Sequence, residues 1–507
     1  MTLEDRESGA ELAGSAASTS SGGDGPAPSP DQVSAAAEIV LAPAESYPRI
    51  DLRSQGQPWT KRRAAGKVLR GAVPHALHAA WSPDPERPDP IALVEGANAG
   101  RQAHLVPLRM ARMAESPFAF LRGAAHVMAW DLARTPRTDI AVVIDGDAHI
   151  SNFGLFGTPQ RDIVLDLNDF DEVTIGPWEW DLKRLVASLA VSARERGIGR
   201  AERRRAVTAC VAGYRLTMLD LAPVGPIEVW HRAARADDLG FKGIATDAES
   251  DAVIRKAVEK ARRRNNRSLL AQVGERRVDG GWRFREDPPI LTAIDDATRE
   301  RVISGLERYA ESLPRERRFM LSRYHVVDVV HRVVGVGSVG TRAYLALLFG
   351  NSDEDAIFLQ VKEAVAPAHA PYLPDLPEPY RSHAGERVVY GQRLLQAVGD
   401  PLLGWTTVAG RPFYVRQMKN MKGEVPLPLL AGRPLVFFAW GYGALLARAH
   451  ARTGDAAAIA GYCGGPNKTG LDEALADWAE LYAEQTERDH AALLDAIASG
   501  RVSASSG

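Results

Sequence analysis

The residues best suited to chemistry lie between Asp145 and Asp181, where acidic and amide side chains follow apolar runs. Asp147 and Asn152 stand in the order D-x-x-x-x-N, the spacing of a kinase catalytic loop. In that loop the Asp faces the attacking hydroxyl and the Asn binds metal. A second apolar run leads to Asp169, which stands where the Asp of a D-F-G motif would hold Mg2+. Because Mg2+ takes one or two carboxylates with phosphate oxygens, we predict Asn152 and Asp169 as metal ligands. Asp147 would orient or deprotonate the acceptor.

The same residue types also have an ordinary structural explanation. Asp, Asn and Gly are the common residues of turns, and each short match alone is typical of turn chemistry. The pieces nevertheless come in the order that a phosphotransferase requires, with a loop, a hairpin and a second loop. That order favours the catalytic interpretation.

A glycine-rich pattern, G-x-G-x-x-G, occupies residues 335–340. The pattern alone is weak, because it also marks dinucleotide-binding folds, in which it opens a helix. Here the following residues predict a strand over 341–349, a turn over 350–355 and a second strand over 356–362. Strand, glycine loop and two further strands are typical of the small lobe of a kinase.

The second of these strands ends in Lys362. In a kinase the glycines let backbone N–H groups approach the phosphates, and the lysine neutralises phosphate charge. A surface lysine at a strand end is the alternative, which the preceding apolar run disfavours. We therefore expect ATP to be held by Lys362 and by the loop residues Gly335, Gly337, Ser338 and Gly340.

The order of these pieces is reversed relative to ordinary kinases, in which the glycine loop and lysine precede the catalytic loop. We infer a circular permutation, which surface termini tolerate. The predicted fold class is α+β, a protein-kinase-like bilobal fold in which Lys362 must lie near Asp169. The helix that runs into the catalytic loop should then appear late, and residues 437–452 have the apolar spacing of a buried helix.

Several motifs resemble those of domain-of-unknown-function family 2252, a bacterial family. They are Met110–Ala125, Gly146–His149, Asn168–Glu172, Gly176–Leu185, Gly335–Arg342, Gln360–Ala364 and Val415–Gly423. The family is similar to the kinase-like and aminoglycoside phosphotransferase superfamily, so the resemblance implies a fold and a reaction class but no substrate. Arg122 lies at the centre of the first motif, and no role is assigned to it.

The resemblance also implies a role for Asp181, which would brace the catalytic loop through hydrogen bonds to its backbone. The alternative is an ordinary Asp at the start of a helix. Two positions depart from the kinase-like pattern: Asp145 stands where His is usual, and Asp171 replaces the glycine of D-F-G.

The helix after Lys362 is expected near residues 387–396, and in a kinase it carries a Glu that pairs with the lysine. Glu386 is the candidate, although it lies at the very start of the helix. Glu363 points to the opposite face of its strand from Lys362. Residues 420–422 are the candidate hinge beside adenine.

The chain is expected to have four parts, the first from its composition and the other three from the kinase-like motifs. Residues 1–45 are rich in Ala, Ser, Gly and Pro and are predicted to be disordered. Residues 46–315 form the large lobe, 316–425 the small lobe, and 426–507 helices that return to the large lobe. Within the large lobe, residues 118–133 have helical apolar spacing.

Charge and cysteine content agree with an intracellular enzyme. The 507 residues carry a formal net charge of -2, which gives no general attraction to nucleic acid or anionic membrane. Cys210 and Cys463 cannot build a disulfide framework. No apolar run reaches the length of a membrane span, so we expect a cytoplasmic protein with a small-molecule acceptor. Its oligomeric state is left open, and His450 and His490 are expected to be structural.

Three other functions stay open. The same parts could transfer AMP from a flipped ATP, or bind nucleotide only to report it to a partner. The run Gly146-Asp-Ala-His149 also resembles part of a dinuclear metallophosphoesterase site. That fold needs further motifs such as G-N-H and G-H-x-H, which are absent downstream. The sequence thus favours an ATP- and Mg2+-dependent phosphotransferase acting on a hydroxylated small molecule.

Overall fold

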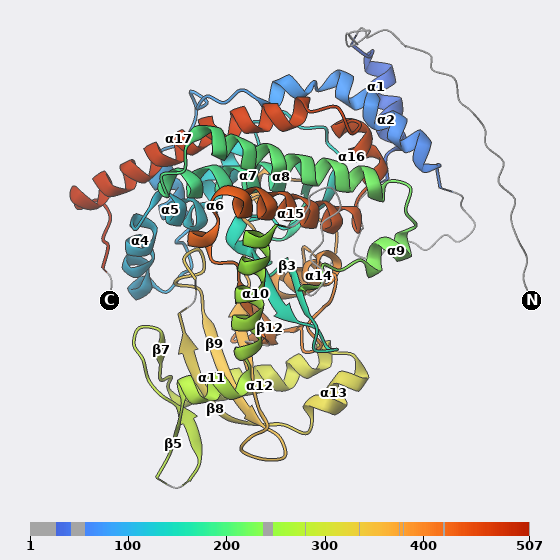
Figure 1. Ribbon diagram of the computed structural model, residues 1–507. Coiled ribbons are helices and arrows are strands. Elements are labelled where there is room, and N and C mark those ends of the chain that lie inside the picture. Colours follow the sequence, from blue (N-terminus) through green and yellow to red (C-terminus); the bar gives the residue numbers. More distant parts are fainter. Residues whose placement is uncertain are drawn as a thin grey trace, which may run out of the picture.

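The protein is described by a computed structural model with mixed α+β architecture, as predicted, in which most helices lie above a region of strands (Figure 1). The residues described are 27–41, 56–236, 247–278, 280–333, 335–374, 376–378, 380–418 and 421–505. Among them no helix combines the length and the apolar character needed to cross a bilayer.

The first helix corrects the prediction of disorder over residues 1–45. Residues Pro30–Ile39 form α1, and α2 follows at Trp59–Ala72; residues 1–26 and 42–45 lie outside the described residues. A capping box begins α1, because Ser29 Oγ accepts from the Gln32 backbone at 3.3 Å while the Gln32 side chain accepts from Ser29 N at 2.8 Å.

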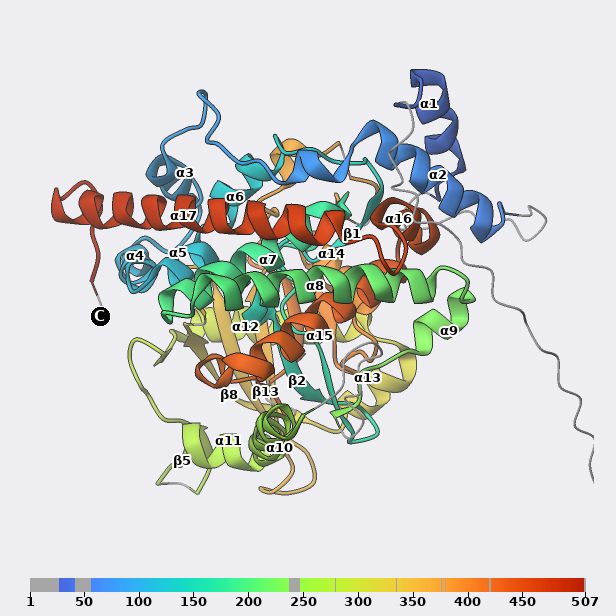
Figure 2. The same cartoon turned by 45° about the horizontal axis from the view of Figure 1, so that its top comes forward.

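The upper part is a stack of long helices around one large hydrophobic core. Figure 2 shows α17, α8 and α15 lying across it one beneath another. The helices of this core are α7 (Trp178–Glu195), α8 (Arg200–Leu221), α15 (Gly432–Ala451), α16 (Ala456–Cys463) and α17 (Gly470–Ala498). A Cβ on Gly443 would lie 1.9 Å from the Cys210 carbonyl oxygen, so α15 and α8 touch backbone to backbone. The late helix predicted over 437–452 is α15.

Short helices flank this stack. They are α3 (Pro90–Gly96), α4 (Val106–Ala114), α5 (Pro117–Gly123), α6 (Ala125–Leu132), α9 (Pro226–His231) and α10 (Ala248–Arg263). The helical spacing of residues 118–133 corresponds to two helices, because Ala124 leaves the helical conformation at φ -109° and ψ 40° and separates α5 from α6.

A six-stranded antiparallel sheet forms the lower part, in the order β11-β12-β10-β9-β8-β7. Its strands are β7 (Leu291–Thr292), β8 (His325–Arg332), β9 (Ala343–Phe349), β10 (Ala356–Glu363), β11 (Gly404–Val408) and β12 (Arg411–Gln417). The strands predicted at 341–349 and 356–362 are therefore present as β9 and β10. The glycine loop (residues 335–340) joins β8 to β9.

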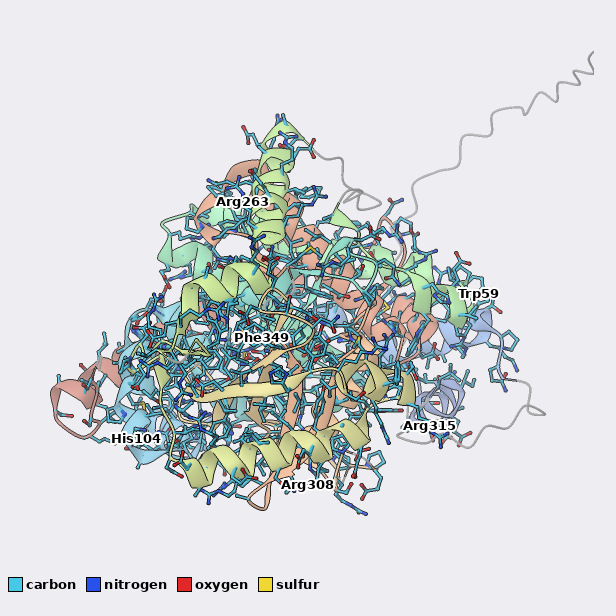
Figure 3. All side chains as sticks on the ribbon, turned by 90° about the horizontal axis from the view of Figure 1, so that it is seen from below. Trp59, His104, Arg263, Arg308, Arg315 and Phe349 are labelled. Atoms are coloured by element: carbon cyan, nitrogen blue, oxygen red, sulfur yellow. The ribbon has the colours of Figure 1, made fainter. Side chains whose placement is uncertain are left out.

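Both faces of the sheet are covered. α12 (Asp296–Tyr309) packs on one face, and α11 (Asn266–Val273) with the β5–β6 hairpin (Gly274–Arg276 and Trp282–Phe284) packs on the other. Figure 3 shows α12, with Arg308, on one side of β9 and α10, with Arg263, on the other. The predicted small lobe, 316–425, thus omits β7 and α12, which share this sheet and its core.

Two small sheets connect the upper and lower parts. β1 (Ala141–Ile144) pairs with β4 (Thr174–Pro177), and β2 (Phe153–Gly157) pairs with β3 (Ile163–Leu167). β13 (Gly423–Glu424), which follows the large sheet, pairs with β2. The loops that carry the predicted catalytic and metal residues therefore lie where the two parts meet. Two further helices, α13 (Arg315–Leu321) and α14 (Ala384–Leu395), belong to the sheet region.

Candidate active site

Asp181 holds the loop that follows β1, here called the Asp147 loop (residues 145–152). Its carboxylate accepts hydrogen bonds from the backbone N–H of Asp145 at 2.7 Å and of Gly146 at 2.9 Å. His450 Nε2 of α15 contacts the same carboxylate at 3.1 Å, while its Nδ1 bonds the Tyr214 hydroxyl at 2.8 Å. The bracing role implied for Asp181 is confirmed. His450 contacts Asp181 and so supports the loop indirectly, as a structural residue.

Gly146 lets this loop approach the next one. Its φ is +78°, and a Cβ at this position would lie 2.2 Å from the Glu172 carbonyl oxygen. Only glycine fits both the conformation and the space. The Asp147 loop therefore touches the loop of residues 168–172, here called the Asp169 loop.

Asp145 is buried, and neither of its carboxylate oxygens has a hydrogen-bond partner among the described residues. Burial, followed by the charges of Asp181, Asp147 and Asp169, holds the pKa of Asp145 well above its usual range. In the residue that stands in place of the usual His, burial and the neighbouring carboxylates therefore disfavour the charged form.

Asp147 forms an ion pair with Arg184 of α7, with 2.6 Å between Asp147 Oδ1 and Arg184 Nη2. His149 Nε2 lies 3.6 Å from the other carboxylate oxygen. Burial raises the pKa of Asp147 to about 7, although the Arg184 charge acts in the opposite direction. A carboxylate that titrates near neutrality is suited to accept a proton from a hydroxyl.

Asn152 lies at the end of the same loop. Its Nδ2 donates to the Asp147 carbonyl oxygen at 2.7 Å, which leaves the side-chain oxygen as its possible metal ligand. Its own carbonyl oxygen accepts from Asn168 N at 2.9 Å. This bond joins the Asp147 loop to the Asp169 loop, so the predicted ligands Asn152 and Asp169 are held close together.

Asp169 and Lys362 meet, as the permutation hypothesis requires. Asp169 Oδ1 lies 4.0 Å from Lys362 Nζ, and this oxygen is buried without a hydrogen-bond partner in the described part of the chain. Burial acts to raise the pKa of Asp169, but the charges of Lys362, Arg416 and Lys422 outweigh it and lower that pKa. The side chain remains 37 % exposed, so an ionised carboxylate faces accessible space.

Lys362 takes its nearest partner from the Asp169 loop. Its Nζ forms an ion pair with Asp171 Oδ2, which also accepts from Ser338 Oγ at 3.0 Å. The Tyr414 hydroxyl donates to Asp171 Oδ1 at 2.8 Å. Whether the candidate Glu386 pairs with Lys362 was open from the sequence; here the carboxylate partners of Lys362 are Asp169 and Asp171.

α14 contacts the Asp169 loop through an arginine instead. Arg387, the residue after Glu386, donates to the Asp171 carbonyl oxygen at 2.7 Å and to the Val173 carbonyl oxygen. Glu363 turns away from Lys362 as predicted, with Arg342 at 3.1 Å and Arg411 at 3.0 Å.

The glycine loop is held open by positive φ angles of +65° at Gly335 and +88° at Gly340. Side chains from the segment before α5 bind its carbonyl oxygens: Arg112 reaches Gly335 O at 2.6 Å, and Arg101 reaches Val339 O at 2.7 Å. Gln102 N donates to Gly340 O at 2.8 Å. The loop is therefore fixed between the sheet and the helices that precede the Asp147 loop.

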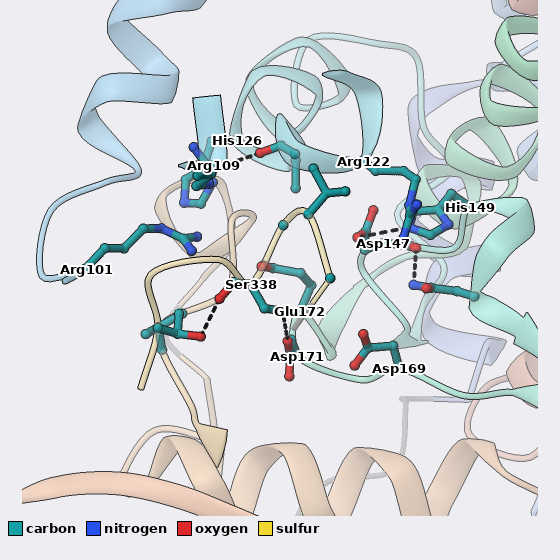
Figure 4. A pocket seen from close by; sticks show the side chains of 18 of the residues that line it. Arg101, Arg109, Arg122, His126, Asp147, His149, Asp169, Asp171, Glu172 and Ser338 are labelled. Carbon is teal, nitrogen blue, oxygen red and sulfur yellow. Dashed lines mark hydrogen bonds and ion pairs between the residues drawn. The ribbon is translucent and has the colours of Figure 1, made fainter. Parts of the chain in front are cut away.

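One cavity gathers most of the predicted site residues (Figure 4). It is lined by Asp147, Asn152, Asp169, Gly335, Gly337 and Ser338. Gly340 and Lys362 are not among the residues that line it. Lys362 pairs with Asp169 and Asp171, and both of these residues line the cavity. Sequence reasoning missed Arg101 and Arg109 in the same wall, and it missed Arg184 and Arg387. No local pattern marks an arginine whose partner lies far away in the chain.

A second cavity adjoins the site at Lys422, with Asn168, Arg416 and Gln417 also lining it. Burial and the charge of Arg416 lower the pKa of Lys422 to about 7. Of the hinge predicted at 420–422, Asn420 lies outside the described residues.

The ligand atoms available in the site show whether the predicted Mg2+ would fit. The described residues contain no group of three or more His, Cys, Asp or Glu side chains that could hold a metal ion. Asp169 and Asn152 offer one carboxylate and one amide oxygen, and Asp169 Oδ1 lacks a hydrogen-bond donor. Mg2+ fits such a sparse oxygen set, because phosphate oxygens and water complete its coordination. A His-rich dinuclear site finds no support in these residues.

Comparisons with curated proteins and with solved structures gave no match. A family model does match, over residues 101–496, which span α4, both loops, the whole large sheet and nearly all of α17. The chain therefore belongs to the family described as "Uncharacterized protein conserved in bacteria (DUF2252)".

Proposed function

We propose that the protein is an ATP- and Mg2+-dependent phosphotransferase that acts on a hydroxylated small molecule. The observation that carries this proposal is the meeting of Lys362 and Asp169 at 4.0 Å, from segments far apart in the chain. Phosphoryl transfer is catalysed mainly by positioning and by charge stabilisation, and kinases use a lysine, a metal-binding Asp, an Asn and a glycine loop for it. Here Asp147, Asn152, Asp169 and part of the glycine loop line one cavity, and Lys362 pairs with Asp169 and Asp171 of its wall.

The strand order supports a kinase-like fold in permuted form. The glycine loop joins β8 to β9, Lys362 lies on β10, and α14 contacts the Asp169 loop through Arg387. A kinase small lobe has the same sequence of parts. α15, near the end of the chain, reaches the Asp147 loop through the contact of His450 with Asp181. A permuted kinase-like chain would need such a contact, because the helix beside its catalytic loop comes late in the sequence.

Asp147 is the proposed base. Its carboxylate accepts the proton of the acceptor hydroxyl as the acceptor oxygen bonds to the γ-phosphorus. The bond from that phosphorus to the β–γ bridging oxygen breaks, and ADP leaves with its electron pair. Arg184 orients the carboxylate at 2.6 Å.

Asn152 and Asp169 would hold Mg2+, which when bound neutralises charge on the phosphates. Lys362 and the backbone N–H groups of the glycine loop are proposed to bind the phosphates themselves. Before a nucleotide binds, Asp171 holds Lys362 in place. In this arrangement Lys362 must exchange part of its contact with Asp171 for a phosphate oxygen.

Labelled ATP tests the proposal. The full-length protein is incubated with a cell extract depleted of small endogenous nucleotides and with ATP labelled at either the γ- or the α-phosphate. We expect the native protein to transfer label from the γ-phosphate and the Asp147→Asn variant to transfer none. Transfer from the α-position alone would identify an AMP transferase. Tight binding of MgATP with no transfer from either position, across extracts, would overturn the catalytic proposal in favour of a nucleotide-binding regulator.

A further inference from the structure

The wall of the cavity includes three arginines, Arg101, Arg109 and Arg122, none of which forms an ion pair with a carboxylate among the described residues. Arg109 is the most buried, at 1 % exposure. Its Nη1 donates to Asn98 Oδ1 at 2.9 Å and its Nη2 to Gly123 O at 2.5 Å, both neutral acceptors. Its Nε is buried and makes no hydrogen bond to the described residues. A buried guanidinium with only neutral partners retains an uncompensated charge.

The other two arginines have the same character. Arg101 donates to the carbonyl oxygens of Ala97 at 2.9 Å and Val339 at 2.7 Å. Arg122 stands 6.0 Å from the centre of the Phe118 ring, and its Nε is buried without a partner in the described residues. Figure 4 places Arg122 beside Asp147 and His149, and Arg109 beside His126.

The acidic residues of the cavity are already engaged elsewhere. Asp147 pairs with Arg184, and Asp171 and Asp169 with Lys362. Glu363 pairs with Arg342 and Arg411, which do not line the cavity. Among the lining carboxylates described, Glu172 alone has no ion pair, and it accepts from Ala368 N at 2.6 Å. Three arginines therefore share one carboxylate that has no ion pair of its own.

We infer that Arg101, Arg109 and Arg122 form a subsite for an anionic group, phosphate or carboxylate, carried by the acceptor. This inference rests on the proposed function and names its substrate class: a hydroxylated small molecule with an acidic group. Planar guanidinium groups bind phosphate and carboxylate through paired hydrogen bonds. Arg122 lies beside Asp147, so the acidic group would bind near the hydroxyl that reacts.

The nucleotide phosphates have a separate set of partners. Lys362 and the glycine loop N–H groups come from the large sheet, whereas the three arginines come from residues 101–122, and the loop turns its carbonyl oxygens toward Arg101 and Arg112 of that segment. The two sets can therefore bind two anions at once.

Isothermal titration of the full-length protein with inorganic phosphate, in the absence and presence of saturating MgADP, tests this inference. Native protein is expected to bind phosphate in both conditions. Arg101→Gln and Arg122→Gln should each weaken phosphate binding about tenfold, since a charged hydrogen bond is lost. Arg122→Gln should keep the native unfolding temperature and MgADP affinity. Arg101 also binds a glycine-loop carbonyl oxygen, so Arg101→Gln is compared with Arg112→Gln, which loses a similar loop contact. Arg109→Gln is not used, because the burial of Arg109 risks a folding defect.

Arg112→Gln is the matched control, because Arg112 also binds a carbonyl oxygen of the glycine loop but does not line the cavity. It should leave phosphate affinity unchanged. A parallel titration with acetate separates a phosphate-bearing acceptor from a carboxylate-bearing one by which anion binds more tightly.

Three results would overturn the subsite. They are no phosphate binding by native protein at millimolar concentration, equal weakening in Arg112→Gln, and complete exclusion of phosphate by MgADP, which would assign the arginines to the nucleotide. Arginine-dependent phosphate binding in a protein that does not bind MgADP would keep the anion subsite and overturn the proposed function instead.

Discussion

Lys362 forms its closest ion pair with Asp171, which stands 191 positions earlier in the chain. In an ordinary kinase the lysine pairs with a Glu on the helix of the small lobe. Here the partner comes from the Asp169 loop, and α14 holds that loop through Arg387 instead. The position of Lys362 is therefore coupled directly to the loop that carries the proposed metal ligand.

Lys362→Met should both destabilise the protein and remove ATP binding. Lys362 is 3 % exposed, and its loss leaves Asp171, 23 % exposed, without its cation. Breaking a buried ion pair on one side costs about 3 kcal/mol, which urea unfolding would measure. Unchanged ATP affinity in this variant would show that the phosphates bind elsewhere.

A double variant separates the two effects. Lys362→Met with Asp171→Leu should regain part of the lost stability, because Asp171 no longer leaves an unpaired charge, yet it should still fail to bind ATP. The exposed Lys468→Met serves as the control and should match the native protein in both measurements.

Asp169→Ala should abolish the part of the ATP-induced thermal stabilisation that depends on Mg2+. A ligand at 100 times its Kd stabilises by about 2.7 kcal/mol, enough for a clear shift of the unfolding temperature. Because Lys362, Arg416 and Lys422 lose a nearby negative charge, stabilisation by ATP in EDTA should be kept or increased. Asp162→Ala, in the turn between β2 and β3, is the control. A native Mg2+ dependence in Asp169→Ala would remove Asp169 from the metal site.

Local sequence patterns predicted the elements that depend on nearby residues. β9 and β10 lie within two residues of their predicted bounds, because apolar runs bounded by Gly and Asp residues define strand and turn together. Asp181 was identified through a family motif, and its two backbone hydrogen bonds confirm that role. α1 was missed because its composition is Ala-rich and it buries only Ala36. The capping box at Ser29 and Gln32 was the available signal.

Long-range ion pairs could not be predicted in the same way. Arg184 lies 37 positions from Asp147, and an arginine on a helix is usually solvated. Glu386 was the candidate partner for Lys362 because the kinase pattern assumes a Glu on the helix. The departure from that pattern, Asp171 in place of glycine, was visible in the sequence and proves to be the residue that pairs with Lys362.

Asp147→Asn should keep MgATP binding and reduce turnover by a factor of about 10² to 10⁴, the usual contribution of a general base. Burial raises the pKa of Asp147 to about 7, and only the ionised form accepts a proton. Turnover should therefore rise with pH up to about 7 and level off above it. A pH profile of γ-phosphate transfer measures this rise, the acidic limb of the profile.

His149 provides the control for that profile. Burial, with the charges of Arg122 and Arg184, holds the pKa of His149 well below its usual range, so His149 is not expected to produce a limb near pH 7. His149→Gln should keep the acidic limb near pH 7. Loss of the limb in His149→Gln, or retained turnover in Asp147→Asn, would place the base elsewhere.

Asp181→Ala should destabilise the protein and lower turnover, although Asp181 touches no substrate in the proposed mechanism. Its loss leaves the N–H groups of Asp145 and Gly146 buried without acceptors, at a cost of about 1 to 3 kcal/mol each. Asp181→Asn keeps one oxygen acceptor and should fall between Ala and native in urea unfolding. The exposed Asp477→Ala, which removes a surface ion pair with Arg204, should change stability by less than about 1 kcal/mol. Native stability in Asp181→Ala would mean that the two hydrogen bonds do not hold the Asp147 loop, and its geometry would then need another support.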